Sequence, residues 1–270
     1  MNERQQKIQR IISDNGEAKL SELERLFPDI STMTLRRDLE KLETLGEIVR
    51  TRSGAKSIAY LSRLNEAQYS EREQENKAEK SFIAHAAYQY VPHGSSIFLD
   101  TGTTVTRLSK LLTKGKLFII TTAPNIALEC AKNHDNTVFM TGGQLSAGNL
   151  SLSGINALSF LDNINIDVAF MAASGFTFSN GFTCGNFDEC QIKKRVIEKA
   201  AKAIMLMDSS KFGRNHPFTF AALPDIDLLI TDGNIAREDL AELQESGVAV
   251  IAVGATVPGR PPVGNQRLIL

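Results

Sequence analysis

The stretch FPDISTMTLRRDLEKLETLG, residues 27–46, decides the fold of the first part of this chain. Ser31 suits a helix N-cap, because its hydroxyl can accept a hydrogen bond from an otherwise unpaired backbone N–H. At about 100° per residue, the adjacent Arg36 and Arg37 fall well away from the apolar stripe that follows the cap. That stripe, with spacings of four, three and three, consists of Leu35, Leu39, Leu42 and Leu45. The pattern predicts a capped helix with an apolar back and a basic front.

Two more helical patterns precede this helix, and a hairpin pattern follows it. Isoleucines over residues 8–12 mark the first helix, and Gly16 is a typical C-terminal stop. Leucines over residues 20–26 mark the second helix. Residues 47–60 indicate two short strands around a turn at Gly54. Three short helices with tight turns and a hairpin together predict a winged helix-turn-helix unit.

A basic helix beside a basic hairpin is typical of DNA-binding proteins, because the helix fits the major groove and the hairpin can contact phosphate. The alternative is a surface helix whose arginines only solubilise it; the N-cap and the order of the elements favour DNA binding. Residues 1–60 carry 11 basic and 10 acidic residues, which does not indicate a polybasic coat protein. We expect DNA contacts from Ser31, Thr32, Thr34, Arg36 and Arg37 on the helix and from Arg50, Arg52 and Lys56 on the hairpin.

The composition of the 270 residues is that of a folded protein, with 42% hydrophobic and 23% charged residues. No apolar run approaches the roughly 20 residues of a membrane helix, and the polar N-terminus does not resemble a signal peptide. The three cysteines form no Cys-x-x-Cys pair, so neither a structural zinc nor a disulfide framework is expected. We therefore expect a cytoplasmic protein with reduced thiols and without metal or cofactor.

The remainder of the chain alternates between apolar strands and amphipathic helices, which predicts a largely parallel α/β sheet covered on both faces. The expected strands lie at 97–99, 117–120, 138–140, 168–171, 203–207, 228–230 and 248–252. The expected domains are residues 1–60 (winged helix-turn-helix), 61–80 (a partly helical linker), 81–256 (α/β domain) and 257–270 (a loosely ordered tail rich in Pro and Gly).

Five of these strands end in small, polar or glycine residues, and in such sheets a ligand binds beyond the carboxyl ends of the strands. The segment after the first strand combines a glycine, two threonines and a helix start, which suits a phosphate group. Any one of these loops by itself is better explained by a capped helix after a strand, whereas all five together favour a ligand site. Glu189 and Lys193, four residues apart, could equally form a surface ion pair. The candidate ligand-binding residues are Asp100, Gly102, Thr103, Thr104, Thr122, Asn125, Gly142, Gly143, Gly175, Thr183, Glu189 and Lys211.

Two blocks of the chain resemble the DeoR family of bacterial repressors. Residues 34–39, Thr-Leu-Arg-Arg-Asp-Leu, match the signature of its DNA-binding domain, although residues 52–55 read Arg-Ser-Gly-Ala where the family usually has His-Gly-Gly-Ala. The Asp-x-Gly-Thr-Thr segment at 100–104, the Gly pair at 142–143 and Asp-Ser-Ser-Lys-Phe-Gly at 208–213 are similar to motifs of its C-terminal domain. The resemblance implies a sensor domain with a fold similar to ribose-5-phosphate isomerase that binds a phosphorylated sugar.

On this basis we expect a repressor of a carbohydrate or nucleoside catabolic operon, which binds double-stranded operator DNA as at least a dimer and is released by a phosphorylated sugar. The resemblance implies that residues 100–104 hold the phosphate or adjacent hydroxyls, that Lys211 balances its charge and that Glu189 binds sugar hydroxyls. One alternative is a sugar-phosphate isomerase with an appended DNA-binding domain, with Asp100, Asp167, Glu189 and Lys193 as candidate acids and bases. Another is a transcriptional activator with the same domains.

Overall fold

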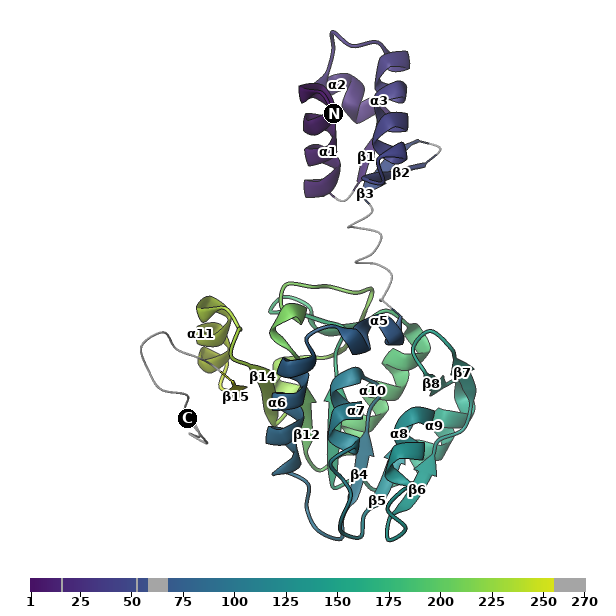
Figure 1. The fold of residues 1–270 in the computed structure, drawn as a ribbon, viewed down its shortest axis with the longest axis vertical. Coiled ribbons are helices and arrows are strands. Elements are labelled where there is room, and N and C mark those ends of the chain that lie inside the picture. The colour runs from purple at the N-terminus through teal and green to yellow at the C-terminus, as the bar shows by residue number, and fades with distance from the viewer. Residues whose placement is uncertain (16, 52, 58–67, 255–270) are drawn as a thin grey trace. The chain divides into compact units, whose positions relative to one another are not determined.

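The structure is a computed structural model that describes residues 1–15, 17–51, 53–57 and 68–254, drawn as ribbons in Figure 1. The chain divides into two compact units, residues 1–66 and 67–270. Each unit has its own hydrophobic core and is described separately. Among the described residues, no helix combines the length and the apolar character needed to cross a membrane.

The described residues of the first unit form three helices and a small antiparallel sheet (Figure 1). Its helices are α1 (Glu3–Asn15), α2 (Leu20–Leu26) and α3 (Thr32–Thr44), and its strands are β1 (Glu17–Lys19), β2 (Ile48–Thr51) and β3 (Gly54–Ser57). The hairpin of β2 and β3 is the predicted wing. Strand β1 was not predicted from the sequence; it pairs with β3 and joins the wing to the helices.

The predicted stripe of α3 forms the core of the first unit, with one exception. Leu35, Leu39 and Leu42 are buried together with isoleucines of α1 and Leu23 of α2. Leu45, in contrast, is 51% exposed, because the helix ends at Thr44 and the chain turns away from the core. A buried polar contact accompanies this core: Asp38 accepts hydrogen bonds from Arg4 Nε (2.6 Å) and Gln5 Nε2 (2.9 Å), which ties α1 to α3.

The second unit is an α/β domain. Its central strands are β4 (Ser96–Leu99), β5 (Phe118–Thr121), β6 (Thr137–Met140), β9 (Val168–Ala172), β12 (Ala203–Leu206), β14 (Leu228–Asp232) and β15 (Ala249–Val253). Its helices are α5 (Tyr69–Gln74), α6 (Lys77–Tyr88), α7 (Thr103–Ser109), α8 (Pro124–Cys130), α9 (Ile155–Asp162), α10 (Phe187–Lys199) and α11 (Arg237–Glu245), with short 3₁₀ turns at Ser209–Lys211 and Leu223–Asp225. The additional strands are β7 (Gln144–Ser146), β8 (Ser151–Ser153), β10 (Gly175–Thr177), β11 (Gly181–Cys184) and β13 (Phe218–Ala221).

The seven central strands are the seven that the sequence predicted, and every pairing between them is parallel. Their order is β15-β14-β12-β9-β4-β5-β6, so the direction of chain winding reverses between β4 and β9. Helices α6, α7 and α8 pack on one face, whereas α9, α10 and α11 pack on the other together with the β10-β11-β13 sheet. Ligands of such sheets bind where the winding reverses.

Residues 69–80 belong to the second unit, whereas we had expected a linker over residues 61–80. Helix α5 and the start of α6 are held by polar contacts at the carboxyl edge of the sheet, described below. Lys80, an apparently ordinary charge in the sequence, is only 1% exposed. The second unit therefore begins earlier than the expected boundary at residue 81. Residues 58–67 and the expected tail at 257–270 lie outside the described residues.

Candidate DNA-binding and ligand-binding sites

The recognition helix has the predicted geometry. The hydroxyl of Ser31 caps α3 by accepting a hydrogen bond from the Thr34 backbone N–H (3.3 Å). Arg36 and Arg37 are exposed on the side of the helix opposite its buried leucines. The hydroxyl of Thr32 instead donates to Glu24 Oε1 of α2 (2.6 Å), so it helps to orient the two helices. Two arginines on one exposed face can form bidentate contacts with guanine edges in a major groove.

The wing is held against the recognition helix by an arginine that was expected to contact DNA. Arg50 Nε donates to Glu43 Oε2 (2.7 Å), and its backbone N–H donates to Glu43 Oε1 (2.9 Å). Both hydrogen bonds lower the pKa of the Glu43 carboxyl, and the bond from the Arg50 backbone N–H has the larger effect. Arg50 thus already has a partner within the unit. Arg52 and the side chain of Lys56 lie outside the described residues.

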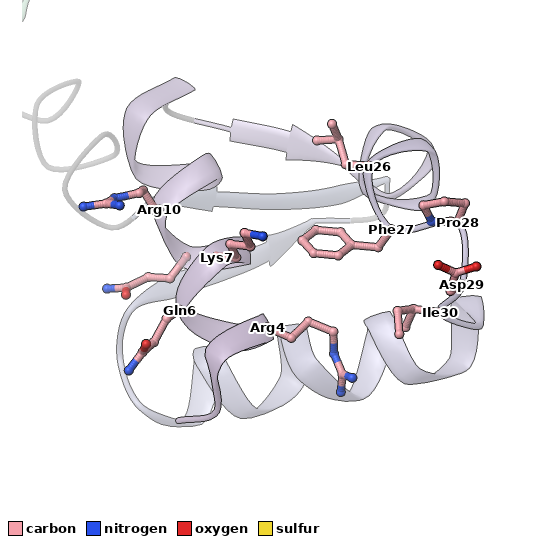
Figure 2. A pocket seen from close by; sticks show the side chains of 10 residues that line it. Arg4, Gln6, Lys7, Arg10, Leu26, Phe27, Pro28, Asp29 and Ile30 are labelled. Atoms are coloured by element: carbon pink, nitrogen blue, oxygen red, sulfur yellow. The ribbon is translucent and has the colours of Figure 1, made fainter.

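A hollow of about 950 Å³ lies between α1 and the turn that leads into α3. Arg4, Lys7 and Arg10 of α1 line it, facing the turn residues Phe27–Ile30. Figure 2 shows Phe27 directed toward Lys7, and Arg4 extending toward Ile30. The sequence analysis did not select these three basic residues, although their spacing of three places them along one side of a helix. Arg4 is already bonded to Asp38, so Lys7 and Arg10 are the further candidates for contacts with the DNA backbone.

In the second unit, three charged side chains meet where the winding of the sheet reverses. Asp100 follows β4, and its carboxylate pairs with Lys193 Nζ and accepts the backbone N–H of Ala172 at the end of β9 (2.9 Å). Lys193 Nζ also lies 3.2 Å from Glu189 Oε1 and donates to the Ala172 carbonyl (3.0 Å). All three charged side chains are less than 9% exposed. Glu189 and Lys193 are therefore not a surface ion pair.

The charge state of this cluster follows from its geometry. Burial acts to lower the pKa of Lys193, but the adjacent carboxylates of Asp100 and Glu189 outweigh it and raise the pKa above its ordinary value. Asp167, the other carboxylate considered as an acid or base, does not join the cluster. It lies immediately before β9, at the opposite end of that strand, and accepts from the Ser96 backbone N–H (2.8 Å).

The loop after β4 has the predicted form of a glycine followed by two threonines at a helix start. Thr103 and Thr104 begin α7, and both are about 5–6% exposed. A Cβ at Gly102 would lie 2.8 Å from Ala172 Cβ, so glycine is needed for close packing of this loop against β9. Gly143, after β6, has φ +106°, and a Cβ there would lie 2.3 Å from the Ser153 carbonyl oxygen. Both glycines are explained by close packing within the protein, without a ligand.

Two of the predicted polar residues are bonded inside the protein. Thr183 is fully buried; its hydroxyl donates to the Gly175 carbonyl (3.2 Å) and accepts from the His216 N–H (3.0 Å). Asn125 Nδ2 donates to the hydroxyl of Tyr69 (2.9 Å). Thr122 is also buried, and its carbonyl accepts the Leu152 N–H (2.7 Å). Gly142, with φ +70°, has open space where a Cβ would be.

Lys211 and four other cationic side chains are linked by electrostatic interactions, and the sequence analysis identified only Lys211 among them. Lys211 is 8% exposed, and its pKa is lowered first by burial and then by the positive charges of Arg214 and Arg72, against the opposing effect of Asp208. Burial likewise lowers the pKa of Lys80 to about 8, and the charges of Lys211 and Arg107 act in the same direction. The five cations are Arg72, Lys80, Arg107, Lys211 and Arg214, which we call the cation group.

The carboxylates of Asp208 and Glu75 act on the pKa values of Lys80 and Lys211 in the opposite sense. Lys80 and Lys211 are buried, whereas Arg72 and Arg107 are half-buried and Arg214 is exposed, so an anion would mainly relieve the positive charge of the two lysines. Only Lys211 was identified from the sequence, because it lies in a motif after a strand. The other four come from α5, α6, α7 and the loop at Arg214, and no spacing along the chain relates them.

Comparison with known proteins identifies both units. Residues 4–60 match the DeoR-like helix-turn-helix domain, and residues 75–233 match the DeoR C terminal sensor domain. Among solved structures, ribose 5-phosphate isomerase A from Methanocaldococcus jannaschii is similar over 52% of this chain and 56% of that chain, with a TM-score of 0.39 and 20% sequence identity.

Relatives of known name match nearly the whole chain. The HTH-type transcriptional regulator YulB of Bacillus subtilis is 36% identical over 251 residues, which cover 93% of this chain and 96% of the relative. GlpR of Haloferax volcanii is 34% identical and covers 92% and 96% of the two chains. The lactose phosphotransferase system repressor of Streptococcus mutans is 30% identical and covers 85% and 91%. The chain thus belongs to the DeoR family of helix-turn-helix transcriptional regulators.

Proposed function

We propose that this regulator is a repressor of a sugar catabolic operon and that a phosphorylated sugar releases it from its operator. The observation that supports the effector proposal is the cation group, in which the buried lysines Lys80 and Lys211 interact electrostatically with each other and with further basic side chains. A phosphate group carries the charge that such a site lacks, and lysine and arginine both bind phosphate. The name of the Streptococcus mutans relative, a repressor of a sugar phosphotransferase system, agrees with this reading.

The sugar itself would lie toward the Asp100–Lys193–Glu189 cluster, which adjoins the Gly-Thr-Thr loop. Asp100 is not suited to holding the phosphate, because its carboxylate is negative and already paired with Lys193. Glu189 is better placed for hydroxyl groups: its Oε2 accepts a hydrogen bond from Asn149 Nδ2 (3.2 Å), in a loop that a ligand could displace. We therefore propose phosphate at Lys80 and Lys211 and hydroxyl groups near Glu189.

On the DNA side, Arg36 and Arg37 of α3 would read base edges, and Lys7 and Arg10 of α1 would contact backbone phosphates. A single unit of this size rarely reaches useful operator affinity, so we propose that the protein binds paired half-sites as at least a dimer. The effector would favour an arrangement that fits the operator poorly. Thermodynamic linkage then requires DNA to weaken effector binding by the same factor, typically about 5–150-fold.

The test is a gel-shift with the operator DNA upstream of the chain's own gene, repeated with a panel of sugar phosphates and their unphosphorylated parents. Release by a phosphorylated compound, but not by its parent, supports the proposal. A specific complex that no compound dissociates contradicts the effector assignment. In Lys211→Ala we expect release to be lost, and binding without compound serves as the check on folding. Equal loss of both would mean that Lys211 supports the fold instead.

A further inference from the structure

Residues 69–76, which we call the strap, cross the carboxyl edge of the sheet and contact four separate parts of the second unit (Figure 1). The hydroxyl of Tyr69 donates to Thr106 Oγ1 of α7 (2.8 Å) and accepts from Asn125 of α8. The Tyr69 backbone N–H donates to the Gly148 carbonyl in the turn between β7 and β8 (2.8 Å). The strap thus links helices α7 and α8 to the turn between β7 and β8.

Arg72 extends this network to the residues proposed for the sugar hydroxyls. Its Nη2 donates to Asn149 Oδ1 (3.2 Å), and the same Asn149 side chain donates to Glu189. The positive charge of Arg72 also acts on Lys211. Arg72 is therefore linked to Glu189 through Asn149, and it also interacts electrostatically with Lys211.

The strap is held in place by the Lys80 ammonium, which would also attract an anion. Lys80 Nζ donates to two strap carbonyls, those of Arg72 (2.6 Å) and Glu75 (2.9 Å). A phosphate oxygen is a stronger acceptor for an ammonium than a neutral carbonyl is. A bound phosphate would therefore compete with the strap for Lys80.

The end of the strap is held in an unusual backbone conformation. Asn76 has φ +47°, in the left-handed region that residues other than glycine rarely adopt. Its side chain donates to Asp208 Oδ1 (2.9 Å) and Ser210 Oγ (3.0 Å), in the loop that carries Lys211. Such a conformation persists only where its surroundings enforce it. A rearrangement of the Lys211 loop would loosen this end of the strap.

We propose that the strap is part of the effector site, with Arg72 contacting the phosphate and Tyr69 a sugar hydroxyl, and that a change in the strap transmits effector binding to the DNA-binding unit. The strap is the first described segment after the boundary between the units at residues 66 and 67. Because the chain leaves the second unit through it, the strap is the covalent route between the two sites. This inference rests on the proposed phosphorylated effector.

The first test compares coupling in full-length Tyr69→Phe with the wild type. Tyr69 is buried, and Asn125 Nδ2 also lies 3.2 Å from Thr106 Oγ1, so these two partners can still bond to each other without the hydroxyl. Coupling is measured as the ratio of operator Kd with and without the phosphorylated compound that releases the wild type. We expect this ratio to fall at least threefold. Tyr88→Phe, at the exposed end of α6, should retain the wild-type ratio. An unchanged ratio in Tyr69→Phe overturns the role of the strap.

The second test does not depend on release from DNA. Hydrogen exchange of the peptide spanning the strap is measured in the full-length wild type with and without inorganic phosphate. We expect phosphate to change the exchange rate of the strap amides, and to leave α11 unaffected. No change in the strap overturns this proposal, whereas a change without release by any sugar phosphate supports the anion site and contradicts the proposed effector.

Discussion

Replacing Lys193 with methionine tests whether the charged cluster at the switch point is held together as the structure indicates. The substitution keeps the length of the side chain and removes the ammonium between Asp100 and Glu189. The two carboxylates left behind are only 1% and 8% exposed. Removing one partner of a buried ion pair costs about 3–5 kcal/mol, because the remaining charge is uncompensated. We expect a loss of that size in the free energy of unfolding of the second unit.

The loss can be measured by urea unfolding followed through the near-ultraviolet circular dichroism of tyrosine, since Tyr69, Tyr88 and Tyr90 all lie in the second unit. With a slope of about 2–3 kcal/mol per molar urea, the midpoint should fall by about 1–2 M. The loss should be smaller at pH 5 than at pH 7.5, because the uncompensated carboxyls of the folded variant then bind protons that the unfolded chain does not hold. A shift under about 0.3 M, or one that is equal at both pH values, would refute the reasoning.

Three further outcomes are expected. Arg37→Ala should weaken operator binding by about 1–3 kcal/mol and relax the preference at one base pair in a competition gel-shift; unchanged affinity rules out base contact. Lys7→Ala combined with Arg10→Ala should reduce the slope of log K against log salt by about 2 while leaving sequence preference intact; an unchanged slope removes both from the interface. Affinity for the phosphorylated effector, measured calorimetrically, should fall as pH rises through about 8, because Lys80 then loses its proton. The free energy of unfolding without effector should rise between pH 8 and 10.5, because the unfolded chain binds more protons than the folded protein in that range. An effector affinity that does not change with pH excludes Lys80 from the site.

The sequence was sufficient to predict the elements of both units, because their signals are local. An N-cap at Ser31 and a stripe of leucines determine a helix without reference to the rest of the chain. The seven buried strands were likewise visible as apolar runs between helices. The exceptions are the short strands β1, β7, β8, β10, β11 and β13, which are three or four residues long and mix polar with apolar side chains. Such strands are stabilised by their partners, so their own sequence carries little signal.

For the candidate site, the sequence located the sheet edge but did not show the structural roles that several residues have there. Gly143 and Thr183 were selected for a ligand, and the structure gives each a sufficient role in the fold. Conversely, the sequence analysis placed Arg72 and Lys80 in a linker, where charged side chains are usually solvated, although both belong to the cation group. A charge in a sequence does not reveal whether it will be buried, since burial depends on elements that are distant along the chain.

By itself the sequence determined the two units, the parallel sheet and the basic face of the recognition helix, because hydrophobic periodicity and capping act over a few residues. Only the tertiary structure decided that Asp100, Lys193 and Glu189 share one buried ion cluster and that cations from separate elements interact with Lys80 and Lys211. Those groups meet because the order of the strands reverses between β4 and β9. That reversal depends on pairing between strands that are distant along the chain, and no local sequence pattern specifies such pairing.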